Sequence, residues 1–367
     1  MNMWKKILST VLSAALAVSL LAGCQSGNGN ENGSGSMAAT EKETAAGSQT
    51  EAEGTEAGQT GPIVLTDQAG RSVTLEAPAE RIVSSYYIST ALLVALGLED
   101  HLTAIEKKAD TRELYKLAAP GLLELPGVGT SKEINVEETA AAEPDLVVLP
   151  LRLKDSAPSF EELNIPVLVV NPETQEDFEA CLALLAQATG TEERGAALLS
   201  CYHEKMQEAR ELVKDLERPS VYFSSSSDYF STCTASMYQN DLIGAAGGRN
   251  VSESLEDGYW KVVSPEEILE WNPQYMFFTA DAEYSREDIL ADEALSAVDA
   301  VKNGNVFRFP SVIEAWDYPT PSSVLGVLWL THMLHPEVYS MEQYLEEARD
   351  FYSEFFGISV TDQQLGV

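Results

Sequence analysis

A repeat within the chain constrains its fold more than any other feature of the sequence. Residues 129–138 align with residues 258–267 without a gap, and a Gly, a Lys and two Glu coincide. In the same register, each copy continues with a proline and then a short apolar run. A polar residue, Asn135 in one copy and Ser264 in the other, is placed to cap a short helix before that run. Two copies of a helix followed by a buried strand predict two similar α/β lobes.

Short apolar runs predict the strands of both lobes, because strands buried on both faces of a parallel sheet are largely apolar. The predicted strands cover residues 63–65, 72–75, 81–85, 145–149 and 167–170 in the first lobe and 220–223, 275–278 and 305–309 in the second. The first two should form a hairpin. A helix after the third run ends at Gly97, where glycine supplies the left-handed residue, and residues 322–356 form a C-terminal helical segment. We expect the fold class α/β, with the first lobe over residues 61–172, a helical hairpin over 173–218 and the second lobe over 219–367.

One long helix is predicted between the lobes. Thr191 can cap it, Glu192 and Glu193 fall in its first turn, and apolar residues keep helical spacing until Pro219. A helix from Glu192 to Glu217 would be about 40 Å long, which exceeds what a crossover within one lobe needs. We therefore expect this helix to brace both lobes.

The N-terminus predicts export and a lipid anchor. Residues 1–23 read as a lipoprotein signal peptide, because two lysines precede an apolar run that is too short for a permanent membrane span. The run closes with Leu-Ala-Gly-Cys, which resembles the bacterial lipobox, so Cys24 is the predicted lipid attachment site. The alternative is an ordinary signal peptide with a chance cysteine. Residues 24–60 are polar and contain no aromatic residue, and we expect a flexible tether on the extracytoplasmic face of the cell membrane.

Charge and cysteine content exclude several classes of protein. The formal net charge is -35, from 23 Lys plus Arg against 58 Asp plus Glu. A surface this acidic repels polyanions, so nucleic acid is not an expected partner. Four cysteines without a Cys-x-x-Cys spacing favour neither a disulfide scaffold nor a zinc site. Cys181 and Cys201 either pair or remain free thiols, and Cys233 is left over.

These features together resemble a known family, the substrate-binding lipoproteins of ABC importers that handle ferric siderophores, haem and cobalamin. The resemblance is carried by residues 73–84, 95–98, 143–147, 241–251, 271–273, 300–306 and 334–337. It implies two Rossmann-like lobes joined by a single long α-helix, a ligand cleft between the lobes and little hinge motion. It also implies a monomer that works with an ABC permease and its ATPase, and neither an enzymatic activity nor a cofactor.

The resemblance further implies how the protein docks. A glutamate on each lobe is expected to meet arginines of the permease, and Glu137 and Glu266 match those positions. They are equivalent to one another in the internal repeat. For either residue alone a solvated glutamate at a helix start would be the simpler interpretation, since the helix dipole stabilises acids there.

The predicted ligand site lies in the loops at the carboxyl ends of the strands, where open α/β sheets bind ligands. The candidate ligand-binding residues are Tyr86, Tyr87, Thr130, Ser131, Arg152, Ser225, Tyr229, Trp260 and Trp316. Aromatic faces with hydroxyls and one Arg suit a bulky chelate or a macrocycle. We expect a ferric siderophore first and a corrinoid or haem second. A bare transition metal is disfavoured and no metal site is predicted, because the four histidines are scattered along the chain.

Two other classes of protein remain as alternatives. A secreted hydrolase would also carry a signal peptide, but the sequence contains no Gly-x-Ser-x-Gly, His-Glu-x-x-His or P-loop motif. A structural surface lipoprotein would share the anchor and the tether without needing a ligand cleft. Ligand binding without turnover would distinguish the predicted function from both.

Overall fold

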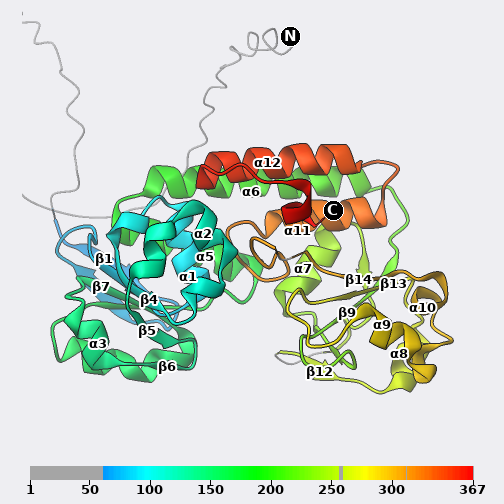
Figure 1. Ribbon diagram of the computed structural model, residues 1–367, viewed down its shortest axis with the longest axis horizontal. Helices are drawn as coiled ribbons and strands as arrows, with labels where there is room; N and C mark the ends of the chain where they lie inside the picture. Colours follow the sequence, from blue (N-terminus) through cyan, green and yellow to red (C-terminus); the bar gives the residue numbers. More distant parts are fainter. Residues whose placement is uncertain (1–60, 256–258, 311, 367) are drawn as a thin grey trace, which may run out of the picture. The chain divides into compact units, whose positions relative to one another are not determined.

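The structure is a computed structural model that describes residues 61–255, 259–310 and 312–366. Residues Gly58–Val367 form one compact unit, and in it two α/β lobes lie side by side (Figure 1). The predicted signal peptide, Cys24 and the predicted tether lie outside the described residues. Within the described ranges, no helix combines the length and the apolar character needed to cross a membrane.

The first lobe contains a six-stranded sheet with the strand order β6-β5-β4-β3-β7-β8. The strands of this lobe are β1 (Ile63–Thr66), β2 (Ser72–Leu75), β3 (Ile82–Ser84), β4 (Leu102–Glu106), β5 (Gly127–Thr130), β6 (Glu133–Ile134), β7 (Leu146–Pro150) and β8 (Val167–Val170). Its helices are α1 (Tyr87–Ala95), α2 (Glu113–Ala118), α3 (Val136–Ala141) and α4 (Ala157–Glu161). Strands β5, β4, β3, β7 and β8 run parallel, whereas β6 pairs antiparallel with β5. Every residue of β7 and β8 is buried, as their apolar sequences predict.

The second lobe contains a sheet in the order β12-β10-β9-β13-β14, with β11 beside β9. Its strands are β9 (Ser220–Ser224), β10 (Ser231–Thr232), β11 (Arg249–Asn250), β12 (Lys261–Val262), β13 (Tyr275–Phe278) and β14 (Val306–Arg308). Its helices are α7 (Tyr238–Ala245), α8 (Pro265–Trp271), α9 (Arg286–Ala291), α10 (Asp299–Asn303), α11 (Val324–Leu334) and α12 (Met341–Phe356). Strands β9, β13 and β14 pair parallel, and β14 forms one edge of this sheet.

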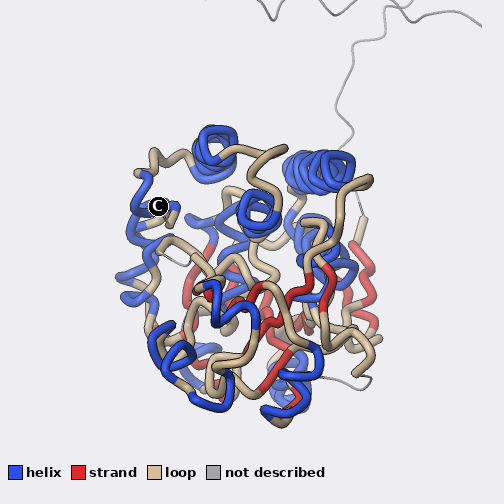
Figure 2. The backbone as a smooth tube through the Cα atoms, turned by 90° about the vertical axis from the view of Figure 1, so that its right-hand side faces the viewer, coloured by secondary structure: helices blue, strands red, loops and turns tan. Residues whose placement is uncertain are grey.

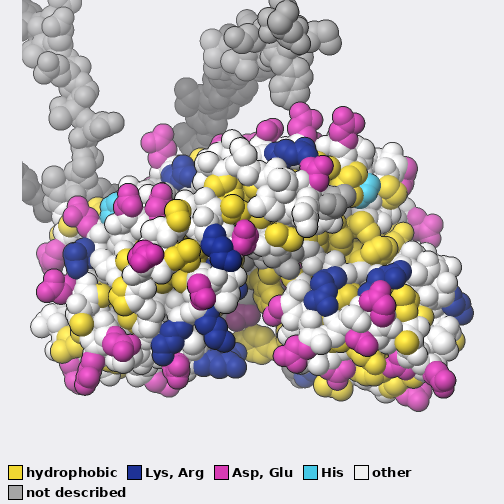
Figure 3. Space-filling model, in the orientation of Figure 1, with side chains coloured by type: hydrophobic (Ala, Val, Ile, Leu, Met, Phe, Trp, Pro, Cys, Tyr) yellow, Lys and Arg dark blue, Asp and Glu magenta, His cyan; other side chains and the backbone are white. Residues whose placement is uncertain are grey.

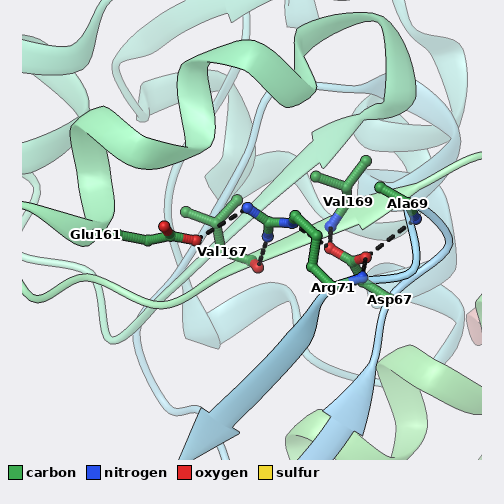
Figure 4. Close-up of polar contacts among 6 residues, drawn as sticks. All are labelled: Asp67, Ala69, Arg71, Glu161, Val167 and Val169. Carbon is green, nitrogen blue, oxygen red and sulfur yellow. Dashed lines mark hydrogen bonds and ion pairs between the residues drawn. The ribbon is translucent and has the colours of Figure 1, made fainter.

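The predicted hairpin of β1 and β2 packs against the outer edge of the first sheet. The Asp67 carboxylate organises its turn, accepting the backbone N–H groups of Ala69 at 3.0 Å and Arg71 at 2.8 Å. It also accepts the Val169 N–H of β8 at 3.1 Å, and the Arg71 guanidinium reaches Glu161 at 2.9 Å (Figure 4). The turn therefore covers the edge of β8, whose backbone groups would otherwise be open to pairing with another chain.

The internal repeat corresponds to equivalent units of the two sheets. Helix α3 begins after Asn135, whose side chain accepts the Glu138 N–H at 3.1 Å, and α8 begins after Ser264, whose hydroxyl accepts the Glu267 N–H at 3.2 Å. The strand after each helix pairs parallel with the first strand of its own sheet, β7 with β3 and β13 with β9. Helices α3 and α8 lie on the same side of the two lobes, opposite the long helices (Figure 1).

The long helices join the lobes, as the sequence predicts. Helix α5 (Gln175–Thr189) leads into α6 (Glu192–Val213), and α12 runs alongside α6 above both lobes (Figure 1). The view in Figure 2 also places the long helices above the strands. Near the start of α6, the Arg194 guanidinium donates to Ala95 O of α1 at 2.6 Å and to Phe355 O of α12 at 2.7 Å. Further along, Lys205 pairs with Glu347 of α12 at 2.6 Å.

Two local helix predictions are wrong, and a third segment is divided. Helix α6 ends at Val213 rather than Glu217, so its 22 residues span about 33 Å; Pro219 follows and disfavours helical backbone before it. Thr191 occupies the N-cap position without a capping hydrogen bond, because its hydroxyl lies 2.9 Å from that of Thr189. The predicted C-terminal segment is two helices, and Pro336, which has no backbone N–H, lies in the break.

One hydrophobic core continues through both lobes. It contains Leu92 of α1, Tyr202 of α6, Phe277 of β13 and Trp329 of α11, and a smaller cluster lies on the opposite face of each sheet. Rotating one lobe against the other would expose part of the shared apolar surface. The shared core therefore favours small relative motion of the lobes.

Candidate functional site

A pocket of about 380 Å³ opens at the carboxyl ends of first-lobe strands. Its walls are formed by Tyr86, Ser131, Pro150, Leu151, Arg152, Val170, Asn171, Glu173 and Tyr259. Tyr259 belongs to the second lobe and the other residues to the first, so the pocket lies in the cleft. The molecular surface is hollowed between the lobes, and Lys and Arg side chains gather on the first-lobe margin of this hollow (Figure 3).

The strand order explains why three of these side chains meet. Tyr86 follows β3 and is the N-cap residue of α1, Arg152 follows β7, and Asn171 follows β8. Because β3, β7 and β8 are adjacent and parallel, their carboxyl ends meet at one edge of the sheet. The hairpin turn also fixes the last of these loops, since the Gln68 side-chain oxygen accepts the Asn171 N–H at 2.7 Å.

The pocket contains the exposed Arg152 guanidinium, the Glu173 carboxylate and neutral hydrogen-bond donors. Burial, with the Glu173 carboxylate nearby, raises the pKa of the Tyr86 hydroxyl far above its ordinary value, so this phenol stays protonated at pH 7. Loss of hydration raises the pKa of Glu173, and Arg152 opposes that shift. Arg152 is exposed, and the Tyr259 side chain is 60% exposed. The pocket can therefore offer a cation, hydrogen-bond donors and an aromatic face to an anionic ligand.

Of the nine predicted ligand-binding residues, Tyr86, Ser131 and Arg152 line this pocket. Thr130 precedes Ser131, and its hydroxyl accepts the Lys132 N–H at 3.2 Å. Trp260 follows Tyr259 and is half-buried, with its ring 6.4 Å from that of Phe223.

Two further candidates make contacts inside the second lobe. The Ser225 side chain is 4% exposed and donates to Asp228 O at 3.1 Å. Tyr229 packs against Tyr284 and donates to the Asp292 carboxylate at 2.8 Å.

Tyr87 and Trp316 lie elsewhere in the molecule. Tyr87 is half-buried, and its hydroxyl donates to Glu314 at 3.2 Å. Trp316 is 1% exposed, and its indole N–H donates to the Tyr352 hydroxyl at 3.0 Å. Packing against α12 leaves the Trp316 side chain no surface for a ligand, so we exclude it from the proposed site.

Sequence reasoning missed Tyr259, Asn171 and Glu173. The internal repeat places Tyr259 on Thr130, which was a candidate, so the repeat could have identified it. Asn171 directly follows a predicted strand and satisfies the rule that selected Arg152. No comparable signal identifies Glu173, because acidic residues are abundant throughout this chain.

The predicted docking residues occupy matching positions. Glu137 and Glu266 are each the second residue of a short helix, α3 or α8, and both side chains are exposed. Helices α3 and α8 lie on the same side of the molecule, away from α6 and α12 (Figure 1). The two carboxylates are therefore available to one partner surface.

The cysteines within the described residues are free thiols: Cys181, Cys201 and Cys233. Burial raises the pKa of Cys201 to about 11 and that of Cys233 to about 12, so both are protonated and weakly reactive at pH 7. Within the described ranges, no group of three or more His, Cys, Asp and Glu could hold a metal ion.

A family model described as periplasmic binding protein matches residues 82–313, which include parts of both lobes. The chain belongs to the periplasmic binding protein family. This periplasmic binding protein is 26% identical over 330 residues to the molybdate-binding protein MolA of Haemophilus influenzae, covering 81% of this chain and 91% of the relative. It is 23% identical to YvrC of Bacillus subtilis, an ABC transporter substrate-binding lipoprotein, covering 76% of this chain and 87% of the relative. Its relatives are solute-binding proteins of ABC transporters rather than enzymes.

Solved structures of periplasmic binding proteins share the fold. The molybdate-bound MolA of Haemophilus influenzae has a TM-score of 0.72 at 22% identity, covering 81% of this chain and 99% of that chain. The Helicobacter pylori CeuE complex with Ni-His has a TM-score of 0.70 at 18% identity, covering 83% and 98% of the two chains. The two-lobed fold predicted from the sequence is thereby confirmed.

Proposed function

We propose that this periplasmic binding protein captures a metal complex, a ferric siderophore first, and delivers it to an ABC permease and its ATPase. We also propose that it is anchored by lipid at Cys24 on the extracytoplasmic face of the cell membrane. The observation that carries the ligand proposal is the pocket formed by Tyr86, Arg152 and Tyr259 at the carboxyl edge of the first sheet. The lipid anchor rests on the Leu-Ala-Gly-Cys sequence, and the relative YvrC is named a lipoprotein.

The size and chemistry of the pocket support a chelate. A volume of about 380 Å³ lies within the range of small-molecule sites. The Arg152 guanidinium can pair with two oxygens of a hydroxamate, catecholate or carboxylate, while Tyr259 offers a ring to the organic part of the ligand. Such a ligand carries its own metal-binding groups, so the protein needs only to recognise the outside of the complex.

A small tetrahedral oxyanion is a second candidate, because the relative MolA is named a molybdate-binding protein. Arg152, the Tyr86 phenol, the Ser131 hydroxyl and the Asn171 amide could surround such an anion with donors. A corrinoid or haem remains the alternative within the family, since other relatives are named vitamin B12-binding proteins.

Titration of the purified protein distinguishes these ligands. Intrinsic fluorescence should change on addition of ferric siderophores, with micromolar or tighter binding, because Tyr259 and Trp260 lie at the cleft. Calorimetry with the same ferric siderophores, molybdate, cobalamin and haem gives the preference without relying on fluorescence. Binding of molybdate or cobalamin without any ferric siderophore would replace the proposed cargo, and binding of only sugars or peptides would contradict the entire class.

A further inference from the structure

Among the buried oxygen atoms of the second lobe that have no hydrogen-bond partner in the described residues, three belong to segments that contact one another. They are Oδ1 of Asp317, Oε1 of Gln239 and Oγ1 of Thr279. Asp317 and Thr279 are fully buried, and Gln239 is 3% exposed. Buried polar atoms without a partner are rare in folded proteins because they lose hydration without compensation. A group of such atoms therefore points to a partner that binds there.

Two hydrogen bonds connect Gln239 with Asp317 and connect Asp317 with the residue after Thr279. The Gln239 side-chain N–H donates to the Asp317 backbone oxygen at 2.8 Å. Since a backbone carbonyl can only accept, this contact fixes the amide orientation and leaves Oε1 as an acceptor. The Asp317 Oδ2 atom accepts the Ala280 N–H at 3.3 Å, and Thr279 is the residue before Ala280. We call Asp317 Oδ1, Gln239 Oε1 and Thr279 Oγ1 the oxygen cluster.

The oxygen cluster lies at the edge of the second sheet that corresponds to the ligand pocket of the first. Thr279 directly follows β13, and the internal repeat aligns residues 279–281 with residues 150–152, which line the pocket. In this alignment Asp281 corresponds to Arg152. The two lobes therefore carry opposite charges at equivalent positions.

Asp281 connects the oxygen cluster with the surface. Its side chain is exposed and accepts a hydrogen bond of 3.2 Å from the Tyr318 hydroxyl. Burial and the neighbouring Asp281 raise the pKa of Asp317 to about 7. Burial, with Asp317 and Asp281 nearby, raises the pKa of the Tyr318 hydroxyl, so it remains a hydrogen-bond donor to Asp281.

We propose that the oxygen cluster, with Asp281 at its surface, is a cation subsite of the cleft that takes a primary ammonium group of the ligand. This inference rests on the proposed function, because it assigns a second chemical group to the same cargo. An ammonium carries three N–H donors, which matches the three oxygens without partners, and two carboxylates supply the opposite charge. The ligand then places the oxygen atoms of its chelate at Arg152 and its ammonium group at Asp281 and Asp317.

The test compares two ferric trihydroxamates that differ at one group: ferrioxamine B, which carries a terminal ammonium, and its N-acetylated derivative, which does not. Calorimetry on the wild type should give at least tenfold tighter binding of the ammonium form. Asp281→Asn and Asp317→Asn should remove that preference and leave affinity for the acetylated form within about twofold. Glu283→Gln is the matched control, because Glu283 is an exposed carboxylate in the same loop. If Asp317→Asn does not fold, Asp281→Asn still tests the subsite, because Asp281 is exposed.

A simple amine separates failure of the subsite from failure of the proposed cargo. Pentylammonium contains no chelate, and it should raise the melting temperature of the wild type and of Glu283→Gln but not of the two Asp variants. If no trihydroxamate binds while pentylammonium behaves in this way, the subsite stands and the cargo is not a ferric trihydroxamate. Equal affinity for both trihydroxamates, or no effect of pentylammonium when neither trihydroxamate binds, overturns the subsite.

Discussion

The Tyr87 hydroxyl donates a hydrogen bond of 3.2 Å to Glu314 Oε1 and so joins the first lobe to the second. The other carboxylate oxygen of Glu314 accepts the Ser322 hydroxyl. On the first-lobe side, the Arg112 guanidinium lies 3.9 Å from the centre of the Tyr87 ring. Glu314 is 2% exposed, so this polar contact between the lobes is shielded from water. Shielding strengthens the hydrogen bonds and makes an ionised carboxylate costly.

This burial predicts that stability declines as the pH rises. Burial raises the pKa of Glu314 from 4.5 to about 7, against the opposing effects of Ser322, Tyr87 and Arg112. Glu314 therefore binds its proton more tightly in the folded state than in the unfolded state. The resulting stabilisation is complete below about pH 4.5 and is lost as the pH rises through about 7, a difference of about 3 kcal/mol for this group. Urea unfolding of the wild type between pH 4.5 and 8 should show this decline.

Glu314→Gln keeps the shape of the side chain and removes its titration, so the decline should be shallower in this variant. Asp317, whose pKa burial also raises to about 7, contributes in the same direction. Glu137→Gln serves as the control at an exposed site and should leave the pH profile unchanged. An identical decline in the wild type and Glu314→Gln would show that other groups control the pH dependence.

Parts of the fold could be predicted because their signals are local. The runs that became β7 and β8 are apolar at every position except the final proline of β7, and the capping residues Asn135 and Ser264 precede short helices in both copies of the repeat. Adjacent parallel strands then explain why Tyr86 and Arg152 meet. In each case, a few neighbouring residues together with one rule of sheet geometry are sufficient.

The remaining parts depend on contacts between distant segments. Trp316 and Tyr259 are both aromatic loop residues, yet Trp316 is buried and Tyr259 is 60% exposed. The difference arises from α12, which is distant from the Tyr259 loop and whose Tyr352 hydroxyl accepts the Trp316 N–H. Nothing in the residues around either aromatic indicates whether a later helix covers it. The contact between Tyr87 and Glu314, which lie 227 residues apart in the sequence, could not be predicted for the same reason.

The pocket predicts a specific role for Arg152. Replacing it with Gln should weaken binding of an anionic ligand about 10- to 100-fold, since hydrogen bonds to charged groups contribute about 1.5–3 kcal/mol. Calorimetry measures the change in affinity, with whichever of the titrated ligands binds the wild-type protein. Lys154→Gln removes the same charge from an exposed residue of the same turn and should have little effect. Equal losses in the two variants would indicate a general charge effect instead of a contact in the pocket.

The two tryptophans should separate stability from binding. Trp316→Phe leaves the buried Tyr352 hydroxyl without its donor and should lower the free energy of unfolding by about 1–3 kcal/mol while ligand affinity is retained. Trp260→Phe should instead reduce the change in fluorescence on ligand binding. Denaturant unfolding and ligand titration of both variants check this division. If Trp316→Phe folds stably but loses ligand affinity, Trp316 is part of the ligand site and the division is wrong.

The lipid anchor predicts a change in localisation. Cys24→Ala should move the protein from the membrane fraction to the soluble fraction, because the lipid would no longer be attached. Metabolic labelling with a radioactive fatty acid and membrane fractionation measure the two consequences. Cys201→Ala is the control, since Cys201 lies within the folded unit. Unchanged membrane partition in Cys24→Ala, together with insensitivity to globomycin, would disprove lipidation at this residue.

The matching positions of Glu137 and Glu266 predict that both carboxylates contact the permease. The double variant Glu137→Ala, Glu266→Ala should bind its ligand with wild-type affinity but support little uptake in cells, and each single variant should lie between. Both residues are exposed at the second position of short helices, so the folded state loses only the favourable interaction with the helix dipole, about 0.3–1 kcal/mol each. Transport of labelled ligand and calorimetry on the purified protein separate docking from capture.

The matched control for docking removes two other glutamates from the same helices. Glu138 and Glu270 are exposed on α3 and α8, and Glu138→Ala, Glu270→Ala changes the net charge by the same amount as the docking variant. Glu267 is unsuitable as a control, because its carboxylate accepts the Ser264 N–H at 2.7 Å and stabilises the start of α8. Uptake should remain near the wild-type level in the control. If both double variants transport equally well, or equally poorly, the two glutamates have no specific role in docking, since only the position of the charges differs between them.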